Sequence, residues 1–145
     1  MHKLQLISDQ LAAADTLYRF AAGLLASAFA DDAISDFRPA AAKAGFDYPV
    51  LTGRDTIVAA LSNSLTAFDT THSVSNPRVS VDGDKAHLDA LVEAQHVPRA
   101  DPSRHYLMKN RYDIDLVRQG DMWVIQRVTI DNVWRSGDPS VLAGV

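Results

Sequence analysis

A strict alternation of apolar and polar residues in the second half of the chain constrains the fold more than any other feature. Alternate positions are apolar over about residues 85–97 and again over about residues 105–117. A period of two is that of a β-strand with one buried face. Turn signals at 82–84 and 119–121 separate these segments from their neighbours. The sequence therefore predicts an antiparallel meander that begins at about His72.

The first half of the chain carries apolar residues at helical spacing instead. One stripe predicts a helix over about residues 3–28. Its core-facing members recur every three or four positions, and they are Ile7, Leu11, Ala14, Tyr18, Ala21 and Leu25. A second helix is predicted from Thr52, whose hydroxyl would accept from the amide of Asp55, to about Ala67. Between the two helices we expect a short strand over residues 34–37, followed by a covering loop.

The composition fits a single domain over residues 1–145, because a chain of 145 residues with 47% hydrophobic content can bury one sizeable core. Helices followed by a twisted antiparallel sheet predict an α+β domain. In such a domain the helices pack on one face of a strongly curved sheet, and the concavity is a pocket. The 14 basic and 18 acidic residues give a formal net charge of −4 and are scattered. We therefore expect no nucleic-acid partner.

The residue types also bear on the compartment. The chain contains no cysteine, which fits a reducing environment, so we expect a cytoplasmic protein. An apolar run over residues 20–30 imitates a secretion signal. The segment before it balances two basic residues against two acidic ones, whereas a signal begins with net positive charge. No apolar run approaches the ~20 residues needed to cross a bilayer, so no membrane partner is expected.

Three polar residues are candidates for the pocket. His72 stands at the entrance to the sheet, while Asn110 and His96 interrupt the apolar faces of two predicted strands. For both histidines a structural role, with the ring hydrogen-bonded inside the fold, is the alternative. The histidines show no pair at metal-ligand spacing, and no Gly-rich phosphate loop precedes a helix. We therefore expect neither a metal nor a cofactor.

Several short segments, taken in order, carry a family resemblance that covers nearly the whole chain. They are Leu17-Tyr18, Phe29-Ala30-Asp31-Asp32-Ala33, Gly53-Arg54-Asp55, Thr71-His72 with Asn76, Asn110-Arg111-Tyr112, and Gly120-Asp121-Met122-Trp123 followed by Arg127. In this order the chain resembles the SnoaL-like branch of the nuclear transport factor 2-like (NTF2-like) superfamily, which includes scytalone dehydratase, a bile acid dehydratase and a hexachlorocyclohexane dehydrochlorinase. The resemblance implies a cone-shaped cavity, dimerisation through the sheet and no obligatory cofactor.

The resemblance also implies a catalytic base. In catalytic members of the family, a histidine at the position of His72 pairs with an aspartate near the end of the first helix, and the pair abstracts a proton. A carboxylate there fixes the imidazole tautomer and stabilises the imidazolium that forms. In this chain the matching position falls at residues 24–26, which read Leu-Leu-Ala, so the chain is shortened between Gly23 and Leu24 or nearby.

Two explanations of the missing acid stay open. Either a deletion removed the acid, or the sequence omits a loop that carries it. If the deletion is real, His72 must rely on another carboxylate. The nearest candidates in sequence are Asp15, Asp31 and Asp36, none of which matches the family motif.

Further residues are expected to contact a substrate. Asn110 and Tyr112 would orient a substrate oxygen, because an amide and a phenol can both donate and accept hydrogen bonds. The resemblance points Arg127 into the cavity, where it would stabilise an anion or a developing oxyanion. Tyr18 would help to position the substrate, and His96 is a secondary site. The alternatives are structural hydrogen bonds for Asn110 and Tyr112, and an ion pair for Arg127.

The leading hypothesis is a small-molecule pocket protein that performs proton-transfer chemistry, such as dehydration, elimination or isomerisation, on an apolar oxygenated substrate. His72 would be the base. Its expected partners are a small apolar or aromatic molecule and a second copy of the chain in a homodimer. One alternative is a non-catalytic ligand-binding module that lost the acid. Another is a structural dimer whose cavity is filled by its own side chains.

Overall fold

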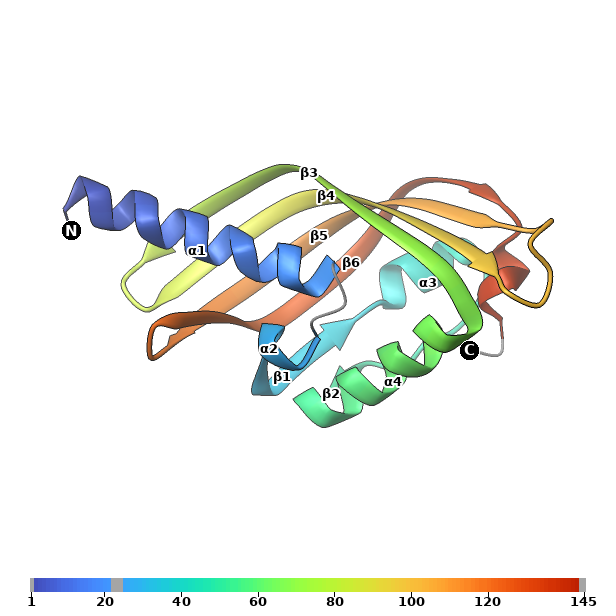
Figure 1. The fold of residues 1–145 in the computed structure, drawn as a ribbon, viewed down its shortest axis with the longest axis horizontal. Coiled ribbons are helices and arrows are strands. Elements are labelled where there is room, and N and C mark those ends of the chain that lie inside the picture. Colours follow the sequence, from blue (N-terminus) through green and yellow to red (C-terminus); the bar gives the residue numbers. More distant parts are fainter. Residues whose placement is uncertain (1, 22–24, 144–145) are drawn as a thin grey trace.

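A six-stranded sheet with helices against its concave face forms the domain (Figure 1). This computed structural model describes residues 2–21 and 25–143, apart from the side chain at position 65. In chain order the elements are α1 (Lys3–Ala21), α2 (Leu25–Ala28), β1 (Phe29–Asp36), α3 (Arg38–Ala44), β2 (Leu51–Thr52), α4 (Arg54–Ala67), β3 (Phe68–Asp82), β4 (Lys85–Pro98), β5 (Tyr106–Gln119), β6 (Met122–Gly137) and a closing 3-10 turn (Pro139–Leu142). The expected α+β fold is confirmed.

The strands lie in the order β2-β1-β6-β5-β4-β3. Only the pair formed by β1 and β6 is parallel among the described strands. Two-residue turns join β3 to β4 and β5 to β6, and the glycine of each turn, Gly83 and Gly120, has a positive φ of about 60°. Glycine reaches this region without the steric cost of a Cβ atom. The predicted meander is therefore confirmed.

An irregularity in β3 bends the sheet. The pairing of β3 with β4 shifts register between Ser75 and Arg78, and Asn76 has a φ of 54° there. An extra residue in one strand increases the local twist and bends that strand. Figure 1 shows the result: α1 lies across one half of the curved sheet, and α3 and α4 lie at the other half.

Helix α1 does not bury the face that its apolar spacing predicts. Ile7, Leu11 and Tyr18 are 43%, 68% and 47% exposed, so the predicted core stripe is wrong for these three residues. The buried side chains of this helix are Asp9, Ala13, Thr16, Leu17 and Phe20. Of the predicted stripe, Leu25 is buried, but it belongs to the separate helix α2.

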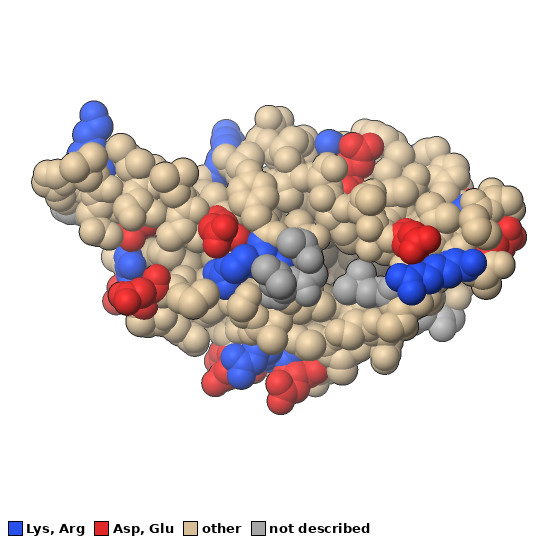
Figure 2. Space-filling view, in the orientation of Figure 1, with Lys and Arg blue, Asp and Glu red and all other residues tan. Residues whose placement is uncertain are grey.

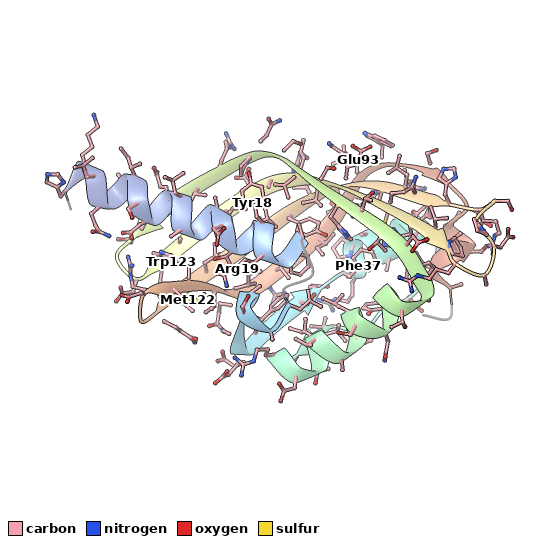
Figure 3. The ribbon with its side chains drawn as sticks, viewed as in Figure 1. Tyr18, Arg19, Phe37, Glu93, Met122 and Trp123 are labelled. Carbon is pink, nitrogen blue, oxygen red and sulfur yellow. The ribbon has the colours of Figure 1, made fainter. Side chains whose placement is uncertain are left out.

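Polar anchors explain the orientation of α1. The Thr16 hydroxyl donates to the backbone carbonyl of Trp123 at 2.9 Å, and the buried carboxylate of Asp9 lies 3.0 Å from Arg118. The guanidinium of Arg19 donates to the same Trp123 carbonyl at 2.9 Å (Figure 3). Each of these partners belongs to the sheet. Because a buried polar group without a partner is costly, these anchors decide which side of the helix faces inward.

The segments after β1 also differ from expectation. Helix α3 forms where a loop was predicted, with Pro39 in its first turn, where a missing N–H breaks no helical hydrogen bond. Helix α4 begins after Gly53 without a side-chain cap, and Thr52 belongs to β2. The expected cap at Thr52 is therefore wrong. The rest of the predicted covering loop, residues 45–50, contributes Tyr48 to the wall of a pocket.

Candidate functional site

A cavity of about 140 Å³ lies between the concave sheet face, the end of α1, and α4 with the loop before β2. Its volume resembles that of an apolar cavity that holds a single benzene ring. The wall is mostly apolar, with Phe20, Phe37, Phe68, Met108 and Ile130 as its large members. Figure 3 shows Phe37 in the space between the sheet and α4. The cavity is open to a ligand, which argues against the structural dimer with a filled cone.

His72 and His96 lie together in the cavity wall. His72 comes from β3, and His96 comes from β4 two positions beyond the partner of His72, Ala94. Their rings stand edge to face, with centroids 6.1 Å apart and an interplanar angle of 80°. The ring of Phe68 meets His96 in the same manner at 5.7 Å. The sheet therefore presents two imidazoles side by side within an apolar space.

Burial disfavours the charged form of both imidazoles. It lowers the pKa of His72 below its ordinary value of 6.5, because a charged ring would lose its hydration there. The pKa of His96 is lowered to about 4, first by burial and then by repulsion from His72. His96 Nδ1 lies 3.4 Å from the backbone carbonyl oxygen of Tyr106. Since a carbonyl only accepts, this contact favours the tautomer with hydrogen on Nδ1.

Neither histidine has the carboxylate partner that a catalytic dyad needs. Among the residues that the structure describes, no Asp or Glu lines the cavity. The three candidates are engaged elsewhere: Asp15 pairs with Arg19 at 3.3 Å, Asp31 pairs with Arg54 at 2.8 Å, and Asp36 receives both Arg38 and Arg127. The predicted shortening between Gly23 and Leu24 lies outside the described residues. The dyad mechanism is therefore not retained.

The other predicted site residues divide into two groups. Asn110 and Tyr112 line the cavity with the two histidines, and both are almost completely buried. Burial raises the pKa of Tyr112, so its phenol stays protonated. Tyr18 and Arg127 are not among the cavity-lining residues. Tyr18 lies on the exposed side of α1 (Figure 3).

The position of Arg127 differs from the one that the resemblance implies. It is paired across the sheet with the exposed Asp115, whereas Ile130, three positions later, lines the cavity. Its guanidinium lies 3.4 Å from the carboxylate of Asp36. A register shift in β6 just before Arg127 turns its side chain to the outer face. This contact with Asp36 is an ion pair, the alternative role considered for Arg127.

One group of side chains on the outer face has the composition of a cation site. His87 lies 3.0 Å from Asp115 and 3.5 Å from Asp113, and the hydrogen bond that its ring donates to Asp115 raises the pKa of His87. One ligand atom from each residue lies within 4.8 Å of the others. All three side chains are substantially exposed.

Elsewhere charged side chains of both signs are interspersed over the surface, as on the face in Figure 2.

A family model described as a SnoaL-like domain matches residues 4–129 of this chain. The chain belongs to the SnoaL-like family. A curated relative of this SnoaL-like protein is Terrestric acid biosynthesis cluster protein E from Penicillium crustosum, which is 29% identical over 145 residues, covering 93% of this chain and 90% of the relative. No helix within the described part of the chain is long and apolar enough to cross a membrane.

Solved structures share the SnoaL-like fold. The Kfla4162 protein from Kribbella flavida superposes with a TM-score of 0.79 and 23% identity, covering 92% of this chain and 96% of that one. The hexachlorocyclohexane dehydrochlorinase LinA-type3 from Novosphingobium barchaimii LL02 superposes with a TM-score of 0.75 and 18% identity, covering 99% and 97%. At these identities the likeness shows the fold alone. The resemblance inferred from the short segments is confirmed.

The SnoaL-like cavity also contains polar residues that the sequence did not single out. Ser35, Ser64 and Tyr48 line it, and burial raises the pKa of the Tyr48 phenol. Phe37 packs edge to face against Tyr48 at 5.7 Å. Ser64 is carried by a helix and Tyr48 by a loop, so no period-two pattern marks them. The position of Ser35, two residues after the buried Ala33 on the same face of β1, is the one signal that was available.

Proposed function

We propose that this SnoaL-like protein catalyses proton transfer, as in a dehydration, elimination or isomerisation, on a small neutral oxygenated molecule with His72 as the proton acceptor. The observation that carries the proposal is an imidazole in the wall of an apolar cavity of about 140 Å³, beside a second imidazole, where burial lowers the pKa of both rings. An uncharged ring nitrogen is the form that accepts a proton at neutral pH. Desolvation at the same time makes the imidazolium costly.

The absence of a carboxylate from the described wall limits the chemistry. Without a negative partner, the protonated form of His72 is stabilised little, so the proton must come from a fairly acidic position or leave the ring again quickly. A carbon next to a carbonyl group meets the first condition. The neutral wall also disfavours a charged ligand, because no described ionic side chain would replace the water that the ligand loses.

A single histidine can both remove the proton and return it. His72 takes a proton from carbon, and the electron pair of that C–H bond forms a carbon–carbon double bond. In a dehydration, the bond to the leaving hydroxyl breaks, and the imidazolium returns its proton to that oxygen to release water. In an isomerisation, an existing double bond next to the new one breaks, and its electron pair takes up the proton at a different carbon. His96, Tyr48 and Tyr112 remain neutral and serve as hydrogen-bond partners for substrate oxygens.

Hydrogen exchange tests the proposal without the natural substrate. Single-ring ketones with α-hydrogens, such as acetophenone, and their β-hydroxy derivatives would be incubated with the protein in deuterated buffer. Loss of the α-proton signals by NMR should be faster than in buffer alone, and His72→Ala should return the rate to that of buffer. His87→Ala, on the outer face, is the matched control and should keep the wild-type rate. Equal rates for wild type and His72→Ala would refute the proposal.

A second function is favoured by one observation, the lack of a carboxylate partner for His72 in the described wall. A protein that lost the acid of its catalytic relatives can keep the cavity as a binding site. In that case acetophenone should stabilise the folded protein in a thermal-shift assay, because a ligand that binds only the native state shifts the equilibrium towards it. Stabilisation without any exchange above the buffer rate would select the binding module.

A further inference from the structure

The buried side chain of Asn132 fixes how the cavity wall presents Asn110. The two asparagines lie opposite each other on β6 and β5, and they are 4% and 1% exposed. Asn132 Nδ2 lies 3.0 Å from the backbone carbonyl oxygen of Trp134 and 3.4 Å from that of Lys109. Carbonyl oxygens only accept hydrogen bonds, so the atom of Asn132 between them must be the amide nitrogen.

This assignment decides the orientation of the second amide. Asn132 Nδ2 also lies 3.0 Å from Asn110 Oδ1. Since Asn132 donates there, Asn110 must offer its oxygen to Asn132 and turn its NH2 group the other way. The nearest partner of that NH2 among the described residues is the sulfur of Met108 at 3.9 Å, which is a weak acceptor. An amide nitrogen has two hydrogens, so at least one of them lacks a strong acceptor.

Asn110 and the two histidines line the same cavity from three different strands. His72, Ala94 and Met108 form one row across β3, β4 and β5, and all three line the cavity. Two strand spacings separate the ends of this row by roughly 10 Å. The methyl group of Ala94 leaves the space above the middle strand open. A ring lying over Ala94 would thus have His72 on the β3 side and Met108 on the β5 side, where Asn110 follows Met108 by two positions and turns its NH2 group towards the Met108 sulfur.

We propose that the ligand of this cavity carries a hydrogen-bond acceptor, either a carbonyl oxygen or the oxyanion that forms from it, and that this acceptor binds the Asn110 NH2 group. Asn132 is the positioning residue through which Asn110 selects such a ligand. The inference deepens the proposed function and rests on it for the reaction, but not for the binding. A buried donor left without an acceptor is costly, so the wall discriminates against ligands of the same shape that have no acceptor. Asn132 holds Asn110 in the donating orientation before the ligand arrives.

Two ligands of nearly equal size test the selection. Acetophenone has a carbonyl group where ethylbenzene has a methylene group. The measured quantity is the ratio of their dissociation constants, ethylbenzene over acetophenone, by calorimetric or NMR titration. In wild type this ratio should exceed that of Asn132→Leu by about fivefold to tenfold, the equivalent of one hydrogen bond. Asn110→Leu should lower the ratio equally, whereas Val133→Leu, an exposed neighbour, should leave it unchanged.

If Asn132→Leu only disturbed the structure in general, both ligands would bind more weakly and the ratio of their dissociation constants would match that of wild type. An unchanged ratio would therefore overturn the inference for Asn132. A measurement on wild type avoids the folding question. The side-chain NH2 resonances of Asn110 should move downfield on saturation with acetophenone and stay in place with ethylbenzene. Equal shifts with both ligands would overturn the proposal.

The outcomes for His72 are separable. His72→Ala should abolish hydrogen exchange and keep the acetophenone preference. If exchange fails in wild type while the preference is present, only the catalytic proposal falls. If exchange is present without the preference, only the role of the two asparagines falls.

Discussion

Replacing His96 with glutamine should remove part of the acid sensitivity of this protein. Burial, with the neighbouring His72, lowers the pKa of His96 from 6.5 to about 4. A histidine whose pKa is lowered by folding binds fewer protons in the native state than in the unfolded chain. The free energy of unfolding therefore decreases as the pH falls below 6.5, and the decrease ends below pH 4, where the histidine is protonated in both states.

The size of the effect follows from the two pKa values. The full penalty is about 3 kcal/mol once the pH lies below both of them. Between pH 7 and pH 5 the same linkage amounts to roughly 2 kcal/mol. This change in the free energy of unfolding is assigned to His96 because its ring lies in the cavity wall, where burial opposes protonation.

Urea denaturation at pH 7 and pH 5 measures this term. Carboxylates elsewhere in the chain also respond to acid, so the informative quantity is the difference between variants. His96→Gln should lose roughly 2 kcal/mol less than wild type between the two pH values, which is a change of about 1 M in the urea midpoint. His2→Gln, which removes an exposed histidine outside the cavity, should follow wild type. Equal losses in wild type and His96→Gln would refute the reasoning.

Three other substitutions test how the fold holds the cavity in place. Arg118→Leu should lower the free energy of unfolding by about 3 kcal/mol in urea, because the buried carboxylate of Asp9 loses its partner at 3.0 Å; a loss below ~1 kcal/mol would contradict this. Leu11→Gln should change the free energy of unfolding by less than ~0.5 kcal/mol, since the side chain is 68% exposed. A loss as large as that of a buried leucine would instead support the predicted core stripe of α1. Gly137→Ala should cost about 2 kcal/mol or more and lower the melting temperature, because its φ is 95° and a Cβ would collide with the backbone carbonyl of His105. An unchanged melting temperature would contradict that last expectation.

Period-two patterning explains why the sheet was predictable. The inner faces of β4 and β5 are continuous apolar rows, so the two polar members on this side, His96 and Asn110, stood out in the sequence and do line the cavity. The face of α1 was not predictable in the same way. Its apolar residues mark one side, but Asp9 and Thr16 find partners on the sheet, and these partners lie far away in sequence.

Two parts of the site depend on local irregularity. The register shift before Arg127 moves its side chain to the outer face, and the residue types around it do not signal a bulge. Tyr48 lies in the wall on the loop that follows α3, a helix that the sequence did not predict. The role of Asn132 was also missed, because β6 is apolar on both sides near its start and its faces could not be assigned from the sequence.

The ionisation of His72 in the folded protein tests the central claim most directly. Histidine side chains labelled with ¹⁵N or ¹³C would be titrated by NMR, with His72→Gln and His96→Gln used to assign the two cavity signals. Two neutral imidazoles in an apolar cavity should both titrate below 6.5, with His96 near 4. A carboxylate partner would instead hold the charged ring and raise the pKa. A His72 pKa above 6.5 would contradict the account of an unpaired base.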